Sequence, residues 1–92
     1  MKMQTNKAIL EEIKALKEIA PKLPESKWGD NNREAAEAQI TVLEKRMTEE
    51  QIYDRWDDEE AYVRDSAWEA LQWMLGRSLD GNPSEDWKTL VK

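Results

Sequence analysis

The chain contains neither cysteine nor histidine, and both absences narrow the functions open to it. Without cysteine it can form no disulfide, no thiolate metal site and no cysteine nucleophile. Without histidine it lacks the usual acid–base group at neutral pH and the most common transition-metal ligand. The composition therefore argues against an enzyme.

Glycine is scarce as well, with three residues in 92. No phosphate-binding loop of the G-x-x-x-x-G-K-[ST] type, no G-x-G-x-x-G and no G-x-S-x-G occurs in the sequence. The acidic segment 54–60 lacks the alternating ligands and the obligatory glycine of a calcium loop. We therefore expect no cofactor and no metal site.

Long apolar runs are also missing, since nothing approaches 18 uncharged apolar residues. Residues 1–7 lead directly into a charged segment and lack the apolar core of a secretory signal. These features predict a cytoplasmic protein with no membrane contact.

Strand-forming residues are few, because the chain has no phenylalanine and little valine or threonine. Alanine, leucine, glutamate, lysine, glutamine and arginine dominate, and all of them favour helix. A mean hydropathy of -0.93 would suit a disordered chain, but five tryptophans and two tyrosines among periodic leucines and isoleucines indicate a core. A chain of this length predicts a single all-α domain over 1–92.

Apolar residues recur at helical spacing along two segments, and each set forms one stripe. The stripes consist of Ile9, Ile13, Leu16 and Ala20, and of Ala36, Ile40, Leu43 and Met47. We predict helices over about 6–20, 32–47, 49–56, 58–75 and 85–91. The first two would form an antiparallel hairpin within a small bundle of four helices plus a short C-terminal helix; a parallel dimer seam is the alternative.

Capping signals support these boundaries. Thr48 and Gln51 fit a capping box, with Met47 and Ile52 as its hydrophobic staple. Asn31 with Glu34, and Asp57 with Glu60, have the same spacing. Gly76 occupies the position of a left-handed helix end, and residues 80–83 predict a turn.

Negative charge is confined to one half of the chain. Residues 1–47 hold eight acidic and nine basic side chains, a net charge of +1, whereas residues 48–92 hold twelve and five, a net charge of -7. Seven carboxylates lie within twelve residues, with Arg55 as the one basic residue among them. They are Glu49, Glu50, Asp54, Asp57, Asp58, Glu59 and Glu60.

This acidic run has two interpretations. Acidic residues near helix starts stabilise the helix dipole and a charged face keeps a protein in solution, which would account for about four of the seven. Alternatively, the run imitates the phosphate backbone of DNA or docks on a basic groove of a partner.

The fourth predicted helix carries a second possible contact surface. Its core stripe contains Val63, Ala67, Trp68, Leu71, Met74 and Leu75. Tyr62 and Trp73 lie on the opposite side, with Ser66 and Glu69 between them. Such aromatic pairs anchor interfaces, so we predict that Tyr62, Glu69 and Trp73 bind a partner. The alternative is a sandwiched helix whose back is covered by the segment around Trp87 and Leu90.

Direct nucleic-acid binding is disfavoured, because the basic residues are mixed with carboxylates at helical spacing and form no continuous stripe. The partner expected from these patterns is a basic surface of a protein or nucleoprotein complex. Self-association through the two apolar stripes, as a homodimer whose acidic half only confers solubility, is the alternative.

With its acidic run, its aromatic segment AYVRDSAWEALQWMLG and its ending NPSEDW, the chain resembles the small acidic proteins encoded by bacteriophages and mobile elements, which include anti-CRISPR proteins. The resemblance is one of size, charge and composition over the whole chain. It implies an inhibitor that occupies the DNA-binding or recruitment surface of a nuclease complex.

Overall fold

The computed structural model describes residues 3–27, 29–57, 61–77 and 81–91. Over these residues all regular secondary structure is helical, which confirms the all-α class. The elements are α1 (Asn6–Ile19), the 3-10 turn η1 (Ala20–Lys22), α2 (Asn32–Lys45), α3 (Glu49–Arg55), α4 (Ala61–Met74) and α5 (Pro83–Lys88).

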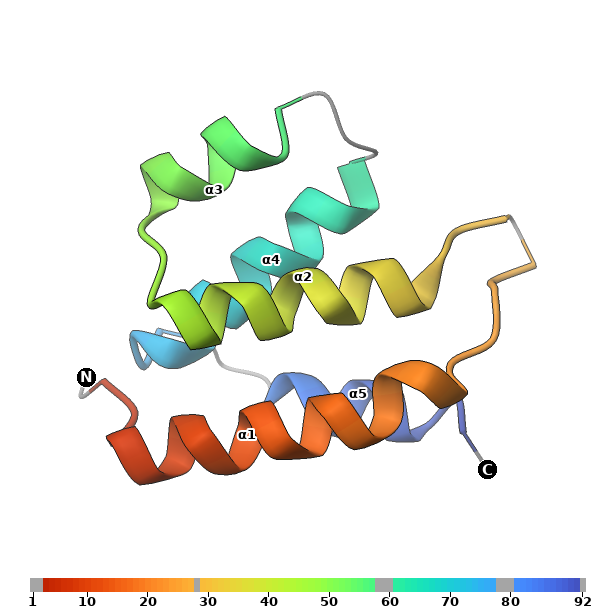
Figure 1. The fold of residues 1–92 in the computed structure, drawn as a ribbon, viewed down its shortest axis with the longest axis horizontal. Helices are drawn as coiled ribbons and strands as arrows, with labels where there is room; N and C mark the ends of the chain where they lie inside the picture. The colour runs from red at the N-terminus through yellow and green to blue at the C-terminus, as the bar shows by residue number, and fades with distance from the viewer. Residues whose placement is uncertain (1–2, 28, 58–60, 78–80, 92) are drawn as a thin grey trace.

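Helix α2 crosses the middle of the molecule and packs on α1 on one side and on α4 on the other (Figure 1). Helices α1 and α2 run in opposite directions, so the predicted hairpin is confirmed (Figure 1). Helix α3 packs on α4, and α5 packs mainly on α1. In Figure 1, α3 lies above α2, and α5 lies below α2 beside α1.

The two predicted apolar stripes form the interface of this hairpin. All of their residues are buried, from Ile9 to Ala20 on one side and from Ala36 to Met47 on the other. Because both stripes are occupied within one chain, neither is left to form a dimer seam.

Small side chains allow α2 and α4 to approach closely. Ala35 and Ala38 of α2 are buried, as are Ala67 and Ala70 of α4. The distance between packed helices depends on the side chains at their contact, and alanine makes it short. The α2–α4 contact is accordingly the most extensive between any two elements.

One polar side chain lies inside this interface. Gln39 of α2 is 1% exposed, and its Nε2 donates to the carbonyl oxygen of Ser66 in α4 at 3.0 Å. Its Oε1 accepts a hydrogen bond from Trp87 Nε1 of α5 at 2.6 Å. A single amide thus connects α2 with two other helices.

The predicted caps at the starts of α2 and α3 are present. Thr48 Oγ1 accepts the Gln51 amide and Gln51 Oε1 accepts the Thr48 amide, which completes the capping box. Asn31 Oδ1 accepts the Glu34 amide at 3.1 Å. The amide of Asn31 donates to the hydroxyl of Tyr62 at 2.9 Å, so a residue of α4 takes the part that the Glu34 side chain plays in a full box.

Helix ends differ from the predictions by a few residues. Helix α2 ends at Lys45 because Arg46 adopts a left-handed conformation with a φ of 50°, and the Arg46 side chain donates to the Leu43 carbonyl. Gly76 has a φ of 74°, as predicted for a helix end. Helix α5 begins at Pro83, earlier than predicted, since proline is favoured in the first turn of a helix. The predicted cap formed by Asp57 and Glu60 extends outside the described residues.

Of the two arrangements considered for the back of the fourth helix, the sandwiched one agrees with the structure at Trp73, which is therefore not open to a partner as a binding residue would be. Trp73 is 9% exposed and belongs to the hydrophobic core. It lies about two turns beyond Ser66, whose carbonyl binds Gln39 of α2, so this side of the helix faces the bundle. A helical wheel gives the direction of a side chain but not the number of neighbouring helices, and α4 has neighbours on more than one side.

Replacement of Trp73 by alanine should therefore destabilise the fold by about 3 to 5 kcal/mol, as truncation of a buried aromatic does. Urea unfolding followed by circular dichroism measures this loss. Leu10→Ala is the control, because Leu10 is 54% exposed and its truncation should change stability by no more than about 0.5 kcal/mol. A Trp73→Ala protein as stable as the Leu10→Ala protein would contradict the burial of this ring.

Candidate binding surface

Helix α3 is a short helix whose position is fixed at its start. Its capping box satisfies backbone groups at the N-terminus, and the staple residues Met47 and Ile52 are both buried. Ile52 and Trp56 form the inner side of the helix and are 0% and 7% exposed. The other side of α3 is left to the solvent.

An aromatic residue occupies that outer side. Tyr53 is 48% exposed, the third-largest value among the large hydrophobic side chains of the described residues. Its ring lies 6.0 Å from the ring of Trp68 in α4, measured between centroids, with an angle of 44° between the planes. Trp68 is half-buried. The two rings form an aromatic pair between α3 and α4, in which Tyr53 is exposed and Trp68 is partly buried against the core.

Carboxylates surround this pair. Glu49 and Glu50 lie one helical turn before Tyr53 on α3, and Asp57 follows the end of that helix. These residues and Asp54 are all exposed. The remaining predicted members of the run, Asp58, Glu59 and Glu60, lie outside the described residues.

Helix α4 adds charged groups beside Trp68. Asp65, one turn before it, is exposed and extends the acidic surface. Glu69, the next residue, is exposed as well.

On α3, the guanidinium of Arg55 lies 5.4 Å from the centre of the Trp56 ring, a cation–π contact that holds this basic side chain against its own helix end. We define the acidic aromatic face as Tyr53 and Trp68 with their exposed carboxylates: Glu49, Glu50, Asp54, Asp57 and Asp65.

The structure therefore brings together a different aromatic pair from the predicted one. Tyr62 is half-buried, and its hydroxyl accepts the Asn31 amide at the start of α2. Trp73 is buried, as described above. Tyr62 has a structural contact and Trp73 is core, whereas Tyr53 and Trp68 were missed as surface residues. The spacing places Trp68 in the core stripe of the fourth helix, but the spacing along one helix does not show where α3 crosses it, so the contact of Trp68 with Tyr53 was missed.

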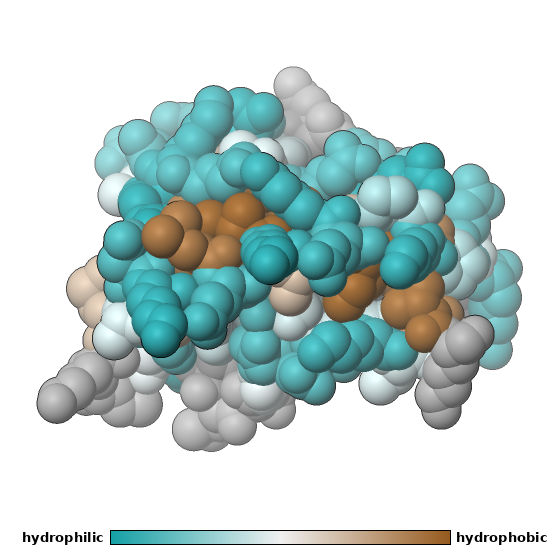
Figure 2. All heavy atoms as spheres, turned by 60° about the horizontal axis from the view of Figure 1, so that its bottom comes forward, coloured by the Kyte–Doolittle hydropathy of each residue, from teal (hydrophilic) through white to brown (hydrophobic). Residues whose placement is uncertain are grey.

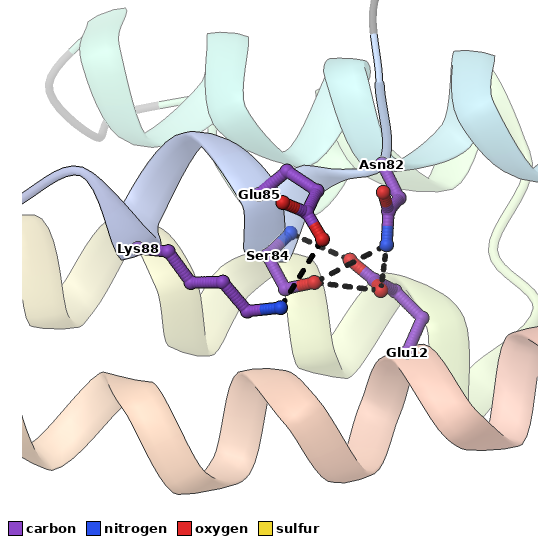
Figure 3. Close-up of polar contacts among 5 residues, drawn as sticks. All are labelled: Glu12, Asn82, Ser84, Glu85 and Lys88. Atoms are coloured by element: carbon purple, nitrogen blue, oxygen red, sulfur yellow. Dashed lines mark hydrogen bonds and ion pairs between the residues drawn. The ribbon is translucent and has the colours of Figure 1, made fainter.

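A buried carboxylate was also missed. Glu12 of α1 is 3% exposed, and Figure 3 shows its side chain directed at the start of α5. Its Oε1 accepts hydrogen bonds from Asn82 Nδ2 at 2.6 Å and from Ser84 Oγ at 2.8 Å. Its Oε2 accepts the backbone amide of Ser84 at 2.6 Å. We call these three residues the Glu12 cluster.

The Glu12 cluster has a structural role. Asn82 is the N-cap residue of α5, but its side chain accepts no backbone amide of that helix and instead donates from Nδ2 to Ser84 Oγ at 3.3 Å, so Glu12 caps α5 from another helix. A buried charge is tolerated when donors surround it, and three donors do so here. No buried polar side-chain atom in the described residues lacks a hydrogen-bond partner. The cluster leaves no free group for chemistry.

Other kinds of site find no support in the described ranges. They contain no group of three or more acidic side chains arranged to hold a metal ion. They also contain no helix that is long and apolar enough to cross a membrane.

Comparison with known proteins gives no family. No protein-family model matches the chain, and neither a curated protein nor a solved structure matches it significantly.

Replacement of Glu12 by alanine should lower the free energy of unfolding by about 2 to 4 kcal/mol. Each buried donor at the start of α5 that loses its acceptor costs about 1 to 3 kcal/mol, and water that enters the space offsets part of this cost. Glu11→Ala is the matched control, since Glu11 is exposed on the same helix and should tolerate truncation within about 0.5 kcal/mol. Chemical denaturation measures the difference. Equal stability of the two variants would show that the cluster contributes nothing.

Proposed function

We propose that this protein is a non-catalytic binding protein that docks through its acidic aromatic face on a basic surface of another protein or nucleoprotein complex. The observation that carries the proposal is the exposed ring of Tyr53, which pairs with the half-buried Trp68 and has exposed carboxylates on both helices near it. Aromatic residues dominate the binding energy of interfaces, and surrounding charges determine partner choice and association rate.

The composition of the face supports a basic partner. Each of the five carboxylates of the face is exposed, and none of them forms an ion pair with another described residue. An exposed set of unneutralised carboxylates attracts surfaces rich in lysine and arginine and accelerates their association. Many basic surfaces of this kind bind nucleic acid. Docking is therefore expected to inhibit nucleic-acid binding by the partner, because the carboxylates of the face occupy the positions of the phosphates.

Inhibition of a nuclease complex, as anti-CRISPR proteins do, is the specific form of this proposal. It rests on the resemblance in size, charge and composition and on the position of the carboxylates. The absence of histidine and cysteine is in keeping with a protein that acts by occupying a surface.

Self-association is a second candidate function, but the contact surface would differ from the two apolar stripes of α1 and α2. The stripes of α1 and α2 are occupied within the chain, but hydrophobic side chains reach the surface in two separate areas on the side that carries α1 and α5 (Figure 2). Leu10 of α1 and Leu90 after α5 are 54% and 45% exposed. Scattered apolar residues are normal on a protein surface, and hydrophilic side chains separate these areas. Sedimentation at several concentrations tests this alternative.

Neutralisation of the face should abolish rapid docking. We expect the variant with Glu49→Gln, Glu50→Gln, Asp54→Asn and Asp57→Asn to associate with the partner at least about tenfold more slowly at low salt, because charge steering raises association rates 10- to 1,000-fold. The partner is first isolated by pull-down from a bacterial lysate, and rates are then measured by surface plasmon resonance at low and high salt. Wild-type association should slow markedly at high salt, since exposed charges are screened within about 8 Å at physiological ionic strength.

The matched control removes four negative charges elsewhere, with Glu11→Gln, Glu18→Gln, Glu25→Gln and Glu37→Gln at exposed positions of the first half of the chain. It should keep most of the association rate. If both variants lose the same rate, net charge and not this face drives binding, and salt-independent association would exclude electrostatic docking altogether.

The aromatic pair should act as the anchor. Tyr53→Ala removes a side chain that is 48% exposed, so folding should change by no more than about 1 kcal/mol while binding loses about 2 kcal/mol or more. Tyr62→Phe is the control: it removes only the hydroxyl that accepts the Asn31 amide, and should weaken folding by about 0.5 to 1.5 kcal/mol without weakening binding. Calorimetric titration and thermal melts separate the two effects. Unchanged affinity after Tyr53→Ala would remove this pair from the interface.

A further inference from the structure

A pocket of about 410 Å³ opens at the end of the bundle where the N-terminal segment, the α2–α3 connection and the end of α4 meet. These segments lie together on the left of Figure 1. The volume falls within the range of about 300 to 1,000 Å³ that is typical of small-molecule sites. Neither ring of the Tyr53–Trp68 pair lines the pocket, and Glu49 is the one residue that the pocket shares with the acidic aromatic face.

Methionine contributes three of the six apolar residues that line this pocket, and Ile9, Leu71 and Leu75 contribute the other three. Met3, Met47 and Met74 all line it, which is three of the four methionines in the chain. Methionine side chains are flexible and polarisable, and they recur where a surface adapts to apolar ligands of varied shape. The wall therefore suits a flexible hydrocarbon chain.

The N-terminal segment is held over this wall. The amide of Gln4 donates to the carbonyl oxygen of Met74 at 2.9 Å, which fixes the segment beside the end of α4. Met3 is nevertheless 61% exposed, the largest value among the large hydrophobic side chains of the described residues. A ligand in the pocket would cover an apolar side chain that the protein alone leaves in water.

The polar groups of the pocket carry a net positive charge. Arg46 and Arg77 contribute two guanidinium groups and Glu49 one carboxylate. Arg46 donates to the Leu43 carbonyl and to Asn6 Oδ1, at 2.6 Å for the latter, and neither contact neutralises its charge. Arg77 is exposed, and its side chain makes no hydrogen bond or ion pair with any described residue. An uncompensated guanidinium beside an apolar cavity is suited to an anionic group attached to a hydrocarbon.

We infer that this pocket binds a free amphiphile with a single hydrocarbon chain and a carboxylate head group, a medium-chain fatty acid being the simplest case. The chain lies against the methionines, and the carboxylate pairs with Arg77. This inference does not depend on the proposed function, because it requires no protein partner.

Decanoate, kept below its micelle-forming concentration, is the probe. Protein labelled with ¹³C at the methionine methyl groups should show saturable shifts of the Met3, Met47 and Met74 signals. The Trp87 indole signal is the internal reference, because that group lies outside the pocket and is bonded to Gln39. Absence of saturable methionine shifts, or equal shifts of the Trp87 signal, would overturn the inference.

The head group is tested with Arg77→Gln, whose exposed position makes the change harmless to folding. We expect it to weaken decanoate binding about tenfold, the effect of losing a hydrogen bond to a charged group, and to leave decan-1-ol binding unchanged. The control Lys22→Gln removes one positive charge at the other end of α1 and should leave both affinities unchanged. An equal loss in the control, or an equal loss for the alcohol, would overturn the pairing of the carboxylate with Arg77.

Discussion

Gln39 lies in the middle of α2 with 1% of its surface exposed, and its amide group is shared between two other helices. The amide nitrogen binds α4 and the amide oxygen binds the Trp87 indole of α5. Alanines on α2 and α4 let the two helices approach closely enough for this short side chain to reach across. Both hydrogen-bonding ends are satisfied, so the group can be buried without the cost of an unpaired amide. The positions of α4 and α5 relative to α2 depend on this contact.

That constraint also decides which surfaces remain for function. The side of α4 that faces Gln39 is closed to a partner, which removes Trp73 from the surface. The hydroxyl of Tyr62 is engaged at the start of α2. Helix α3 packs on α4 and on no other helix to a comparable extent, and its outer side with Tyr53 therefore stays open. The least constrained helix of the bundle thus carries both the carboxylates and the exposed ring.

Much of the fold could be predicted because its signals are local. The stripes of the first two helices, the Thr48 capping box and the left-handed Gly76 all depend on residues a few positions apart, and each agrees with the structure. Local spacing also predicted that the acidic residues of α3 would be exposed at a helix start, and those that the structure describes are exposed.

The arrangement of the site could not be predicted in the same way. The contacts of Glu12 with Ser84 and of Gln39 with Trp87 join residues 72 and 48 positions apart, and a glutamate or glutamine on a helix ordinarily faces water. One local signal was available for Glu12: it lies next to Ile13 and one turn before Leu16, inside the buried stripe. The pairing of Tyr53 with Trp68 depends on where α3 crosses α4, which neither helix encodes alone.

The capping of α5 by Glu12 has a consequence for synthesis of the chain. Ribosomes add about 5 to 20 residues per second, so Glu12 is made roughly 4 to 14 s before Asn82 and Ser84, its partners 70 and 72 positions later. During that interval its carboxylate has only water to bind, and α1 keeps this side hydrated. Burial of Glu12 becomes favourable when the start of α5 leaves the ribosome. A chain that ends before Asn82 has none of the three donors that surround this carboxylate in the finished fold.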